Sequence, residues 1–171
     1  YTKLNRRAAA PPRRSDALAA PPLVGRADEW AQIVSAWERT RPGSPALVLI
    51  AGDSGIGKTR LAEEALTWAD ARGMATARSR AYEAEGRLAF GPITELLRSS
   101  AVRAALANLE PVWRAEVARL LTELLVEDPT LPPPAPLSDY WQRQRFFEAL
   151  ARALTKASSS LVVVIDDLQW S

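Results

Sequence analysis

The stretch Gly52-Asp53-Ser54-Gly55-Ile56-Gly57-Lys58-Thr59 fits the pattern G-x-x-x-x-G-K-[ST]. It follows an apolar run at 46–51 and precedes a helical pattern, so the sequence predicts a buried strand, a glycine turn and a helix. Glycines tolerate the dihedral angles that let backbone N–H groups converge on one point. We interpret the stretch as a phosphate-binding loop. The alternative, a glycine-rich turn with a surface lysine, does not explain the flanking pattern.

The residue types in this loop suggest specific roles. The helix that follows adds its N-terminal partial positive charge to the converging N–H groups. Lys58 is the candidate contact to the β- and γ-phosphates, and the Thr59 hydroxyl is a candidate Mg²⁺ ligand. The predicted nucleotide contacts of the loop are Gly52, Asp53, Ser54, Gly55, Ile56, Gly57, Lys58, Thr59 and Arg60.

Composition excludes several classes of chemistry. The chain has 171 residues, no Cys and no His, which leaves no thiolate or imidazole metal site and no disulfide. Five basic residues crowd the first fourteen positions, and the remainder has 17 basic against 20 acidic residues. We therefore expect no nucleic-acid site in the main body. No apolar run is long enough to cross a membrane, and a cytoplasmic protein is the expectation.

The rest of the chain divides into a linker and a single α/β domain. Residues 1–22 are rich in Ala, Pro and Arg and predict a flexible basic linker, followed by a domain at 23–171. Strands are expected at 46–51, 74–81 and 161–165, although arginines interrupt the alternation of the second. Helices are expected from Asp28 to about residue 40 and at 58–71, 92–98, 102–126 (with a break before Pro111) and 140–157.

A second half of the site is predicted at the end of the last strand. The apolar run Leu161–Ile165 is followed by Asp166 and Asp167, and a parallel strand delivers such carboxylates to the edge of the sheet where ligands bind. This is the pattern of a Walker B element. Asp166 is the candidate metal residue and Asp167 the candidate group that positions or deprotonates the attacking water. Taken alone, the same pattern also suits carboxylates that cap a following helix.

Together these segments resemble the STAND and AAA-like signalling ATPases, in particular the AAA-type ATPase module of large bacterial LuxR-family regulators. The resemblance is carried by Leu23-Val24-Gly25-Arg26, by the loop through Leu61, and by Asp166-Asp167-Leu168-Gln169-Trp170. It implies a P-loop NTPase fold of three αβα layers with a mostly parallel sheet and a helical insertion at about 92–157. It also implies that Val24, Gly25 and Arg26 lie near the adenine and ribose of ATP or ADP, and that Tyr82, Glu83 and Glu85 lie near the γ-phosphate.

The resemblance further implies a regulatory switch that hydrolyses ATP with Mg²⁺ within a larger protein, beside other domains such as a DNA-binding domain. In that family the module continues past Walker B, so we expect this chain alone to bind nucleotide weakly and to hydrolyse it slowly or not at all. The missing strands would leave a sheet edge that favours self-association. The alternatives are a P-loop kinase and a nucleotide-binding scaffold without turnover.

Overall fold

The computed structural model describes residues 25–41, 43–82 and 90–170, and within them a parallel sheet of two strands. Strand β1 (Ala75–Arg80) pairs with β2 (Leu161–Asp166) in a register that runs from Ala75 opposite Leu161 to Arg80 opposite Asp166. Both strands were predicted from the sequence and are confirmed. The carboxyl ends of the two strands therefore meet at the same edge of the sheet.

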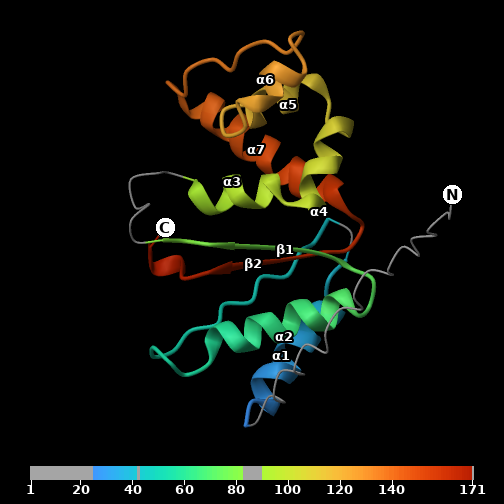
Figure 1. Ribbon diagram of the computed structural model, residues 1–171, viewed down its shortest axis with the longest axis vertical. Coiled ribbons are helices and arrows are strands. Elements are labelled where there is room, and N and C mark those ends of the chain that lie inside the picture. The colour runs from blue at the N-terminus through green and yellow to red at the C-terminus, as the bar shows by residue number, and fades with distance from the viewer. Residues whose placement is uncertain (1–24, 42, 83–89, 171) are drawn as a thin grey trace, which may run out of the picture.

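Helices cover both faces of this sheet (Figure 1). Helices α1 (Ala27–Glu38) and α2 (Lys58–Asp70) lie on one side, and α2 contacts both strands. Helices α3 (Gly91–Arg98), α4 (Ser100–Arg103) and α7 (Tyr140–Ala157) lie on the other. The described chain thus has three αβα layers.

The helical pattern predicted at 102–126 is broken into several short pieces. They are α4, a 3₁₀ turn η2 (Ala104–Asn108), α5 (Pro111–Val117) and α6 (Glu123–Glu127). The main break comes before Pro111, where Leu109 and Glu110 are extended, with ψ of 137° and 144°. A residue that precedes proline is driven from the helical region by a clash with the proline ring. A further 3₁₀ turn, η3 (Leu168–Trp170), follows β2.

The main apolar core lies between α3 and α7 rather than near the glycine-rich loop. The Phe146 side chain is 1% exposed and meets the Phe90 ring edge-on at 5.2 Å. Asp139 caps the start of α7, because its carboxylate accepts a hydrogen bond from the Gln142 N–H at 2.8 Å. The neighbouring Phe147 is 53% exposed. The residues of this core with 0% exposure are Leu97, Val102, Leu106, Val117, Leu121 and Ala149.

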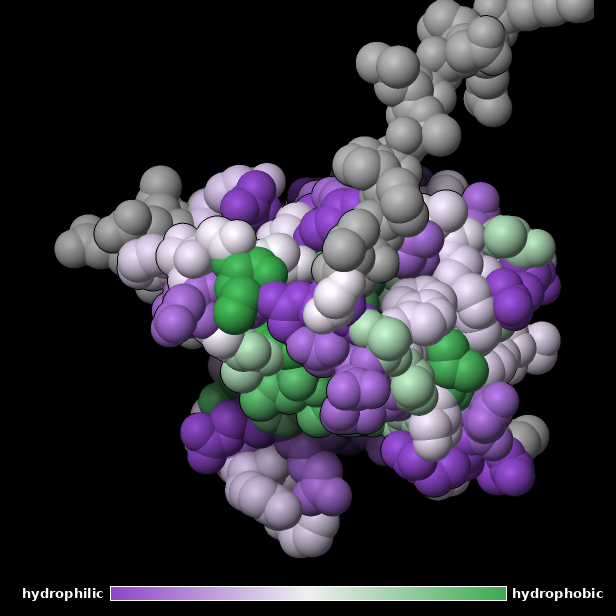
Figure 2. Space-filling model, turned by 90° about the horizontal axis from the view of Figure 1, so that it is seen from below, coloured by the Kyte–Doolittle hydropathy of each residue, from purple (hydrophilic) through white to green (hydrophobic). Residues whose placement is uncertain are grey.

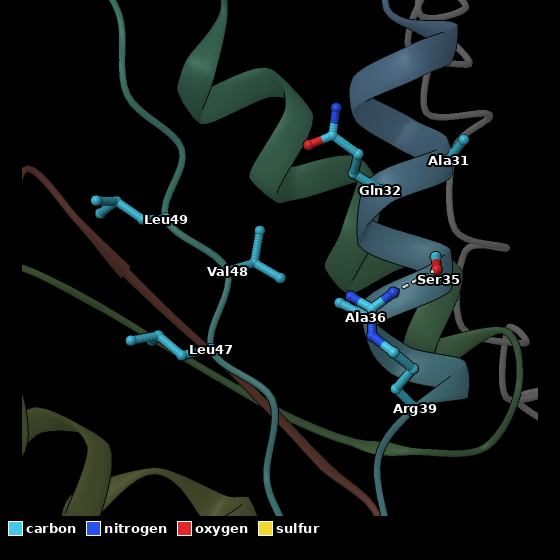
Figure 3. Close-up of a pocket in the computed structure, with 8 residues that line it drawn as sticks. All are labelled: Ala31, Gln32, Ser35, Ala36, Arg39, Leu47, Val48 and Leu49. Atoms are coloured by element: carbon cyan, nitrogen blue, oxygen red, sulfur yellow. Dashed lines mark hydrogen bonds between the residues drawn. The ribbon is translucent and has the colours of Figure 1, made fainter.

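The prediction of a buried strand at 46–51 is wrong. This segment pairs with no strand among the described residues, and Leu47 and Leu49 are 95% and 74% exposed. Its side chains still alternate, because Val48 turns toward α1 while Leu47 and Leu49 point away (Figure 3). A strand needs a lateral hydrogen-bonding partner, and residues 46–51 pair with neither open edge of the described two-stranded sheet. Apolar surface is accordingly open on the side that carries α1 and α2 (Figure 2).

Three tryptophans join α1 to α2. The ring of Trp68 on α2 meets those of Trp30 and Trp37 on α1 edge-on, at 6.1 and 6.2 Å. The guanidinium of Arg72 lies 4.2 Å from the centre of the Trp68 ring. Edge-on aromatic pairs and cation–π contacts each stabilise such a joint by about 1 kcal/mol. This tryptophan joint holds α1, which follows Arg26, against α2, which follows the glycine-rich loop. In the described part of the chain, no helix is long and apolar enough to span a membrane.

Candidate functional site

The glycine-rich loop turns directly into α2. Gly55 and Gly57 have φ of 79° and 95°, a left-handed backbone that is costly for any residue with a Cβ. Gly57 is the residue that precedes the helix, and no side chain caps the helix there. The first N–H groups of α2 have no intrahelical acceptor and point back into the loop. This is the arrangement that binds a phosphate at a helix N-terminus.

Lys58 lies folded across the loop. Its Nζ donates hydrogen bonds to the carbonyl oxygens of Gly52 and Asp53, at 3.0 and 2.8 Å. The ammonium group is therefore held over the concave side of the loop by two neutral acceptors. Charged oxygens of a phosphate would be stronger acceptors than these carbonyls.

Arg26 ties the start of α1 to the loop. Its Nη2 donates to the Ile56 carbonyl oxygen at 2.5 Å, and its Nη1 pairs with Glu29 at 2.5 Å. A pocket of about 140 Å³ lies at this junction. Its lining includes Arg26, Ile33, Ile50, Ile56, Lys58 and Leu61. A larger hollow of about 470 Å³ lies beside it, between α1 and residues 47–49 (Figure 3).

The two halves of the predicted site meet at Thr59 and Asp166. The Thr59 hydroxyl donates to Asp166 Oδ1 at 3.3 Å across 107 positions of sequence. The same oxygen accepts the backbone N–H of Asp167 at 3.0 Å. The Asp166 side chain is only 10% exposed, so its carboxylate is fixed at the end of β2, at the start of α2.

Asp167 is held in an unusual conformation. Its φ of 55° lies in the left-handed region, which costs a non-glycine residue about 1–2 kcal/mol. Asp167 Oδ2 accepts a hydrogen bond from Arg80 Nε at 2.7 Å and forms an ion pair with Arg80 Nη2 at 2.6 Å, and Oδ1 accepts a hydrogen bond from Gln169 at 3.2 Å. These bonds favour the charged carboxylate, so Arg80 first and Gln169 second lower the pKa of Asp167.

The oxygen atoms at this point suit Mg²⁺. Thr59 Oγ1 and Asp166 Oδ1 are hard donors that face one another. Mg²⁺ in nucleotide sites keeps several waters and takes phosphate oxygens, so one or two protein ligands suffice. Among the described residues there is no group of three or more acidic side chains that would form a cage for the metal. The arrangement fits a metal that arrives with a nucleotide.

The structure describes some of the remaining predicted site residues, and the others lie outside the described part of the chain. Asp53 and Ser54 are exposed on the loop, and the Arg60 guanidinium pairs with Glu64 of α2 at 3.0 Å. Gly25 precedes Arg26 with φ of 70°, and Tyr82 is 48% exposed beyond β1. Val24, Glu83 and Glu85 lie outside the described residues.

Sequence reasoning missed two arginines. Arg78 and Arg80 on β1 contact Asp166 and Asp167, respectively. In the sequence they only weakened the strand pattern. The available signal was their spacing of two, which places both side chains on one face of a strand.

A phosphate-binding loop at the start of α2 and two carboxylates at the end of a parallel strand define a P-loop nucleotide-binding module. Comparison with known families bears this out, because a model of the AAA ATPase domain matches residues 22–171. The chain belongs to this family and has its P-loop NTPase α/β fold. No curated protein and no solved structure matches the chain.

Proposed function

We propose that the domain is an ATP- and ADP-binding switch within a larger, cytoplasmic signalling or transcriptional regulator, in which it hydrolyses ATP with Mg²⁺. The observation that supports this most is the Thr59–Asp166 contact, which joins the phosphate loop to the end of β2. A site that only bound phosphate would not need the second carboxylate, Asp167, beside the first. The resemblance to LuxR-family regulators supports the regulatory role.

Each residue of the site has its own role in this proposal. Lys58 exchanges the carbonyls of Gly52 and Asp53 for phosphate oxygens, and the N–H groups at the start of α2 bind the same phosphates. Thr59 and Asp166 would hold Mg²⁺, which would neutralise charge on the β- and γ-phosphates. Asp167 orients the attacking water.

Adenine recognition is proposed for the pocket beside the loop. Residues of α1 and of the loop both line this pocket, and Arg26, which also lines it, donates to the Ile56 carbonyl oxygen, so a base bound there would contact both α1 and the loop. Because α1 and α2 are joined through their tryptophans, a change at either segment is transmitted to the other. This coupling is what a nucleotide-dependent switch requires.

Titration of the protein with a fluorescent ATP analogue tests the proposal. We expect Lys58→Ala to weaken binding by about ten- to a hundred-fold, since hydrogen bonds to charged groups contribute about 1.5–3 kcal/mol. Lys156→Ala is the matched control, because Lys156 is a lysine of α7 that pairs with Glu110 far from the loop. Equal binding by wild type and Lys58→Ala would show that the proposal is wrong.

Two further readouts separate the alternatives. Phosphate release without an added acceptor is expected of an ATPase and not of a kinase. Exchange of bound ADP for ATP is expected of a switch, whereas a scaffold would retain ADP.

A further inference from the structure

Strand β1 places two arginines on the face of the sheet that carries α2. Arg78 and Arg80 are two positions apart, and side chains at that spacing share a face of a strand. In the sheet register Arg80 lies opposite Asp166 and Arg78 opposite Val164. Both guanidinium groups therefore reach the carboxylates at the end of β2.

The two arginines are bound in different ways. Arg80 directs two nitrogens at a single oxygen of Asp167. Arg78 instead bridges two acids: Nη1 pairs with Glu63 of α2 at 2.9 Å, and Nη2 with Asp166 Oδ2 at 3.3 Å. The Arg78 contact to Glu63 is the shorter one, and the contact to Asp166 is made on the oxygen that Thr59 leaves free.

This bridge lies on the carboxylate that is proposed to hold the metal. We infer that Arg78 is a displaceable counter-ion: it compensates the charge of Asp166 before the metal binds, and moves wholly onto Glu63 when the metal enters between Thr59 and Asp166. The inference rests on the proposed function for the place of the metal. It adds to that function that Arg78 competes with the metal for Asp166, and that Glu63 binds Arg78 when the metal displaces it.

Burial and charge support the exchange. The Asp166 side chain is only 10% exposed, and a carboxylate so little solvated needs a compensating cation. A metal on the same carboxylate would repel the guanidinium. Arg78 is 38% exposed and already bonded to Glu63, which is 42% exposed, so it can leave Asp166 without losing its other partner. Arg78 thus lowers the affinity of the site for metal. Glu63 makes this loss of affinity smaller, because it keeps a partner for Arg78 after the metal has bound.

Manganese binding to the 171-residue protein tests this inference. Mn²⁺ alone is titrated and the free ion is measured by electron paramagnetic resonance, first without nucleotide and then with ADP. We expect Arg78→Met to bind Mn²⁺ roughly three- to five-fold more tightly, the size of a partly exposed ion pair. Glu63→Gln is expected to bind it more weakly, since Arg78 then has only Asp166 as a partner.

Arg80→Met is the matched control for charge. It removes the same charge from the same face of the same strand, but its partner is Asp167. A tightening with Arg78→Met that exceeds the tightening with Arg80→Met supports direct competition. Equal effects of the two variants would overturn the inference, as would a shift of Glu63→Gln in the same direction as Arg78→Met.

The outcomes for the inference and for the proposed function remain distinct. If Arg78→Met fails to fold by circular dichroism, the comparison of Glu63→Gln with Glu64→Gln still decides, since both remove one acid of α2 and only Glu63 pairs with Arg78. A larger weakening with Glu63→Gln supports the inference, and equal weakening overturns it. If the protein binds no nucleotide, the titration with Mn²⁺ alone still tests Arg78 while the proposed function fails. If no variant binds Mn²⁺ with or without ADP, there is no metal for Arg78 to oppose and the inference is wrong.

Discussion

The helical side of the molecule and the side that carries the phosphate loop are stabilised differently. Between α3 and α7, Leu97, Leu106 and Phe146 are almost completely removed from water. On the loop side, Leu47 and Leu49 are exposed, and the loop is held by polar contacts from Arg26 and Thr59. Burial therefore stabilises the helical side, whereas a few directed bonds position the phosphate loop itself. The difference suggests that stability and nucleotide binding can be altered separately.

The largest effect is expected in the helical core. Phe146→Ala should lower the free energy of unfolding by about 3–5 kcal/mol, because it removes a buried aromatic ring and leaves a cavity. Urea unfolding followed by circular dichroism measures the loss. Phe147→Ala is the matched control, since the adjacent ring is 53% exposed and should cost much less. Similar losses for the two variants would contradict the comparison.

An intermediate effect is expected from the ion pair between Arg98 of α3 and Glu123 of α6, whose atoms are 2.9 Å apart. The hydrogen bond from Arg98 lowers the pKa of Glu123 below its ordinary value of 4.5. The stabilisation that this ion pair gives to the folded state is therefore present above pH 4.5, and it is lost as the pH falls through the lowered pKa of Glu123. Arg98→Met should lose at most about 1 kcal/mol at pH 7.

Urea unfolding at pH 7 and pH 3 checks this prediction. The difference in unfolding free energy between wild type and Arg98→Met should shrink at the lower pH, because Glu123 takes up a proton as the pH falls through its lowered pKa. A difference that is unchanged or larger at pH 3 would show that Arg98 acts through packing rather than through the carboxylate.

The smallest effect is expected at the exposed run before the loop. Leu47→Ser should change the free energy of unfolding by less than about 0.5 kcal/mol, because the side chain is 95% exposed. A loss above 1.5 kcal/mol would show that this run is packed in solution. Sedimentation velocity on the same variant tests the predicted self-association, which should decrease if residues 46–51 provide the contact.

Local patterns in the sequence identified most of the elements. The glycine spacing before Lys58 predicted the start of α2, and the apolar run before Asp166 predicted β2, because both depend on neighbouring residues. The sequence also identified Thr59 and Asp166 as candidate Mg²⁺ ligands from their positions in the two motifs. These features are local, so no knowledge of strand pairing was needed.

Pairing between distant segments was the part that sequence did not reveal. The contacts of Arg78 and Arg80 depend on the register between β1 and β2, which are separated by five helices and a 3₁₀ turn in the described chain. The same limit explains the error at 46–51, where an apolar run indicates a strand but not the presence of a neighbour. Composition sets the tendency to form a strand, and only the topology decides whether a partner is at hand.

The tryptophan joint between α1 and α2 gives the protein an intrinsic optical probe. Trp30 lies four residues after Arg26, and Trp68 lies on the helix that begins at Lys58. Indole emission depends on the polarity and charge around the ring, and Arg72 places a cation against the Trp68 ring. Small rotations of α1 against α2 would therefore change the wavelength or the intensity of the tryptophan emission in the unlabelled protein.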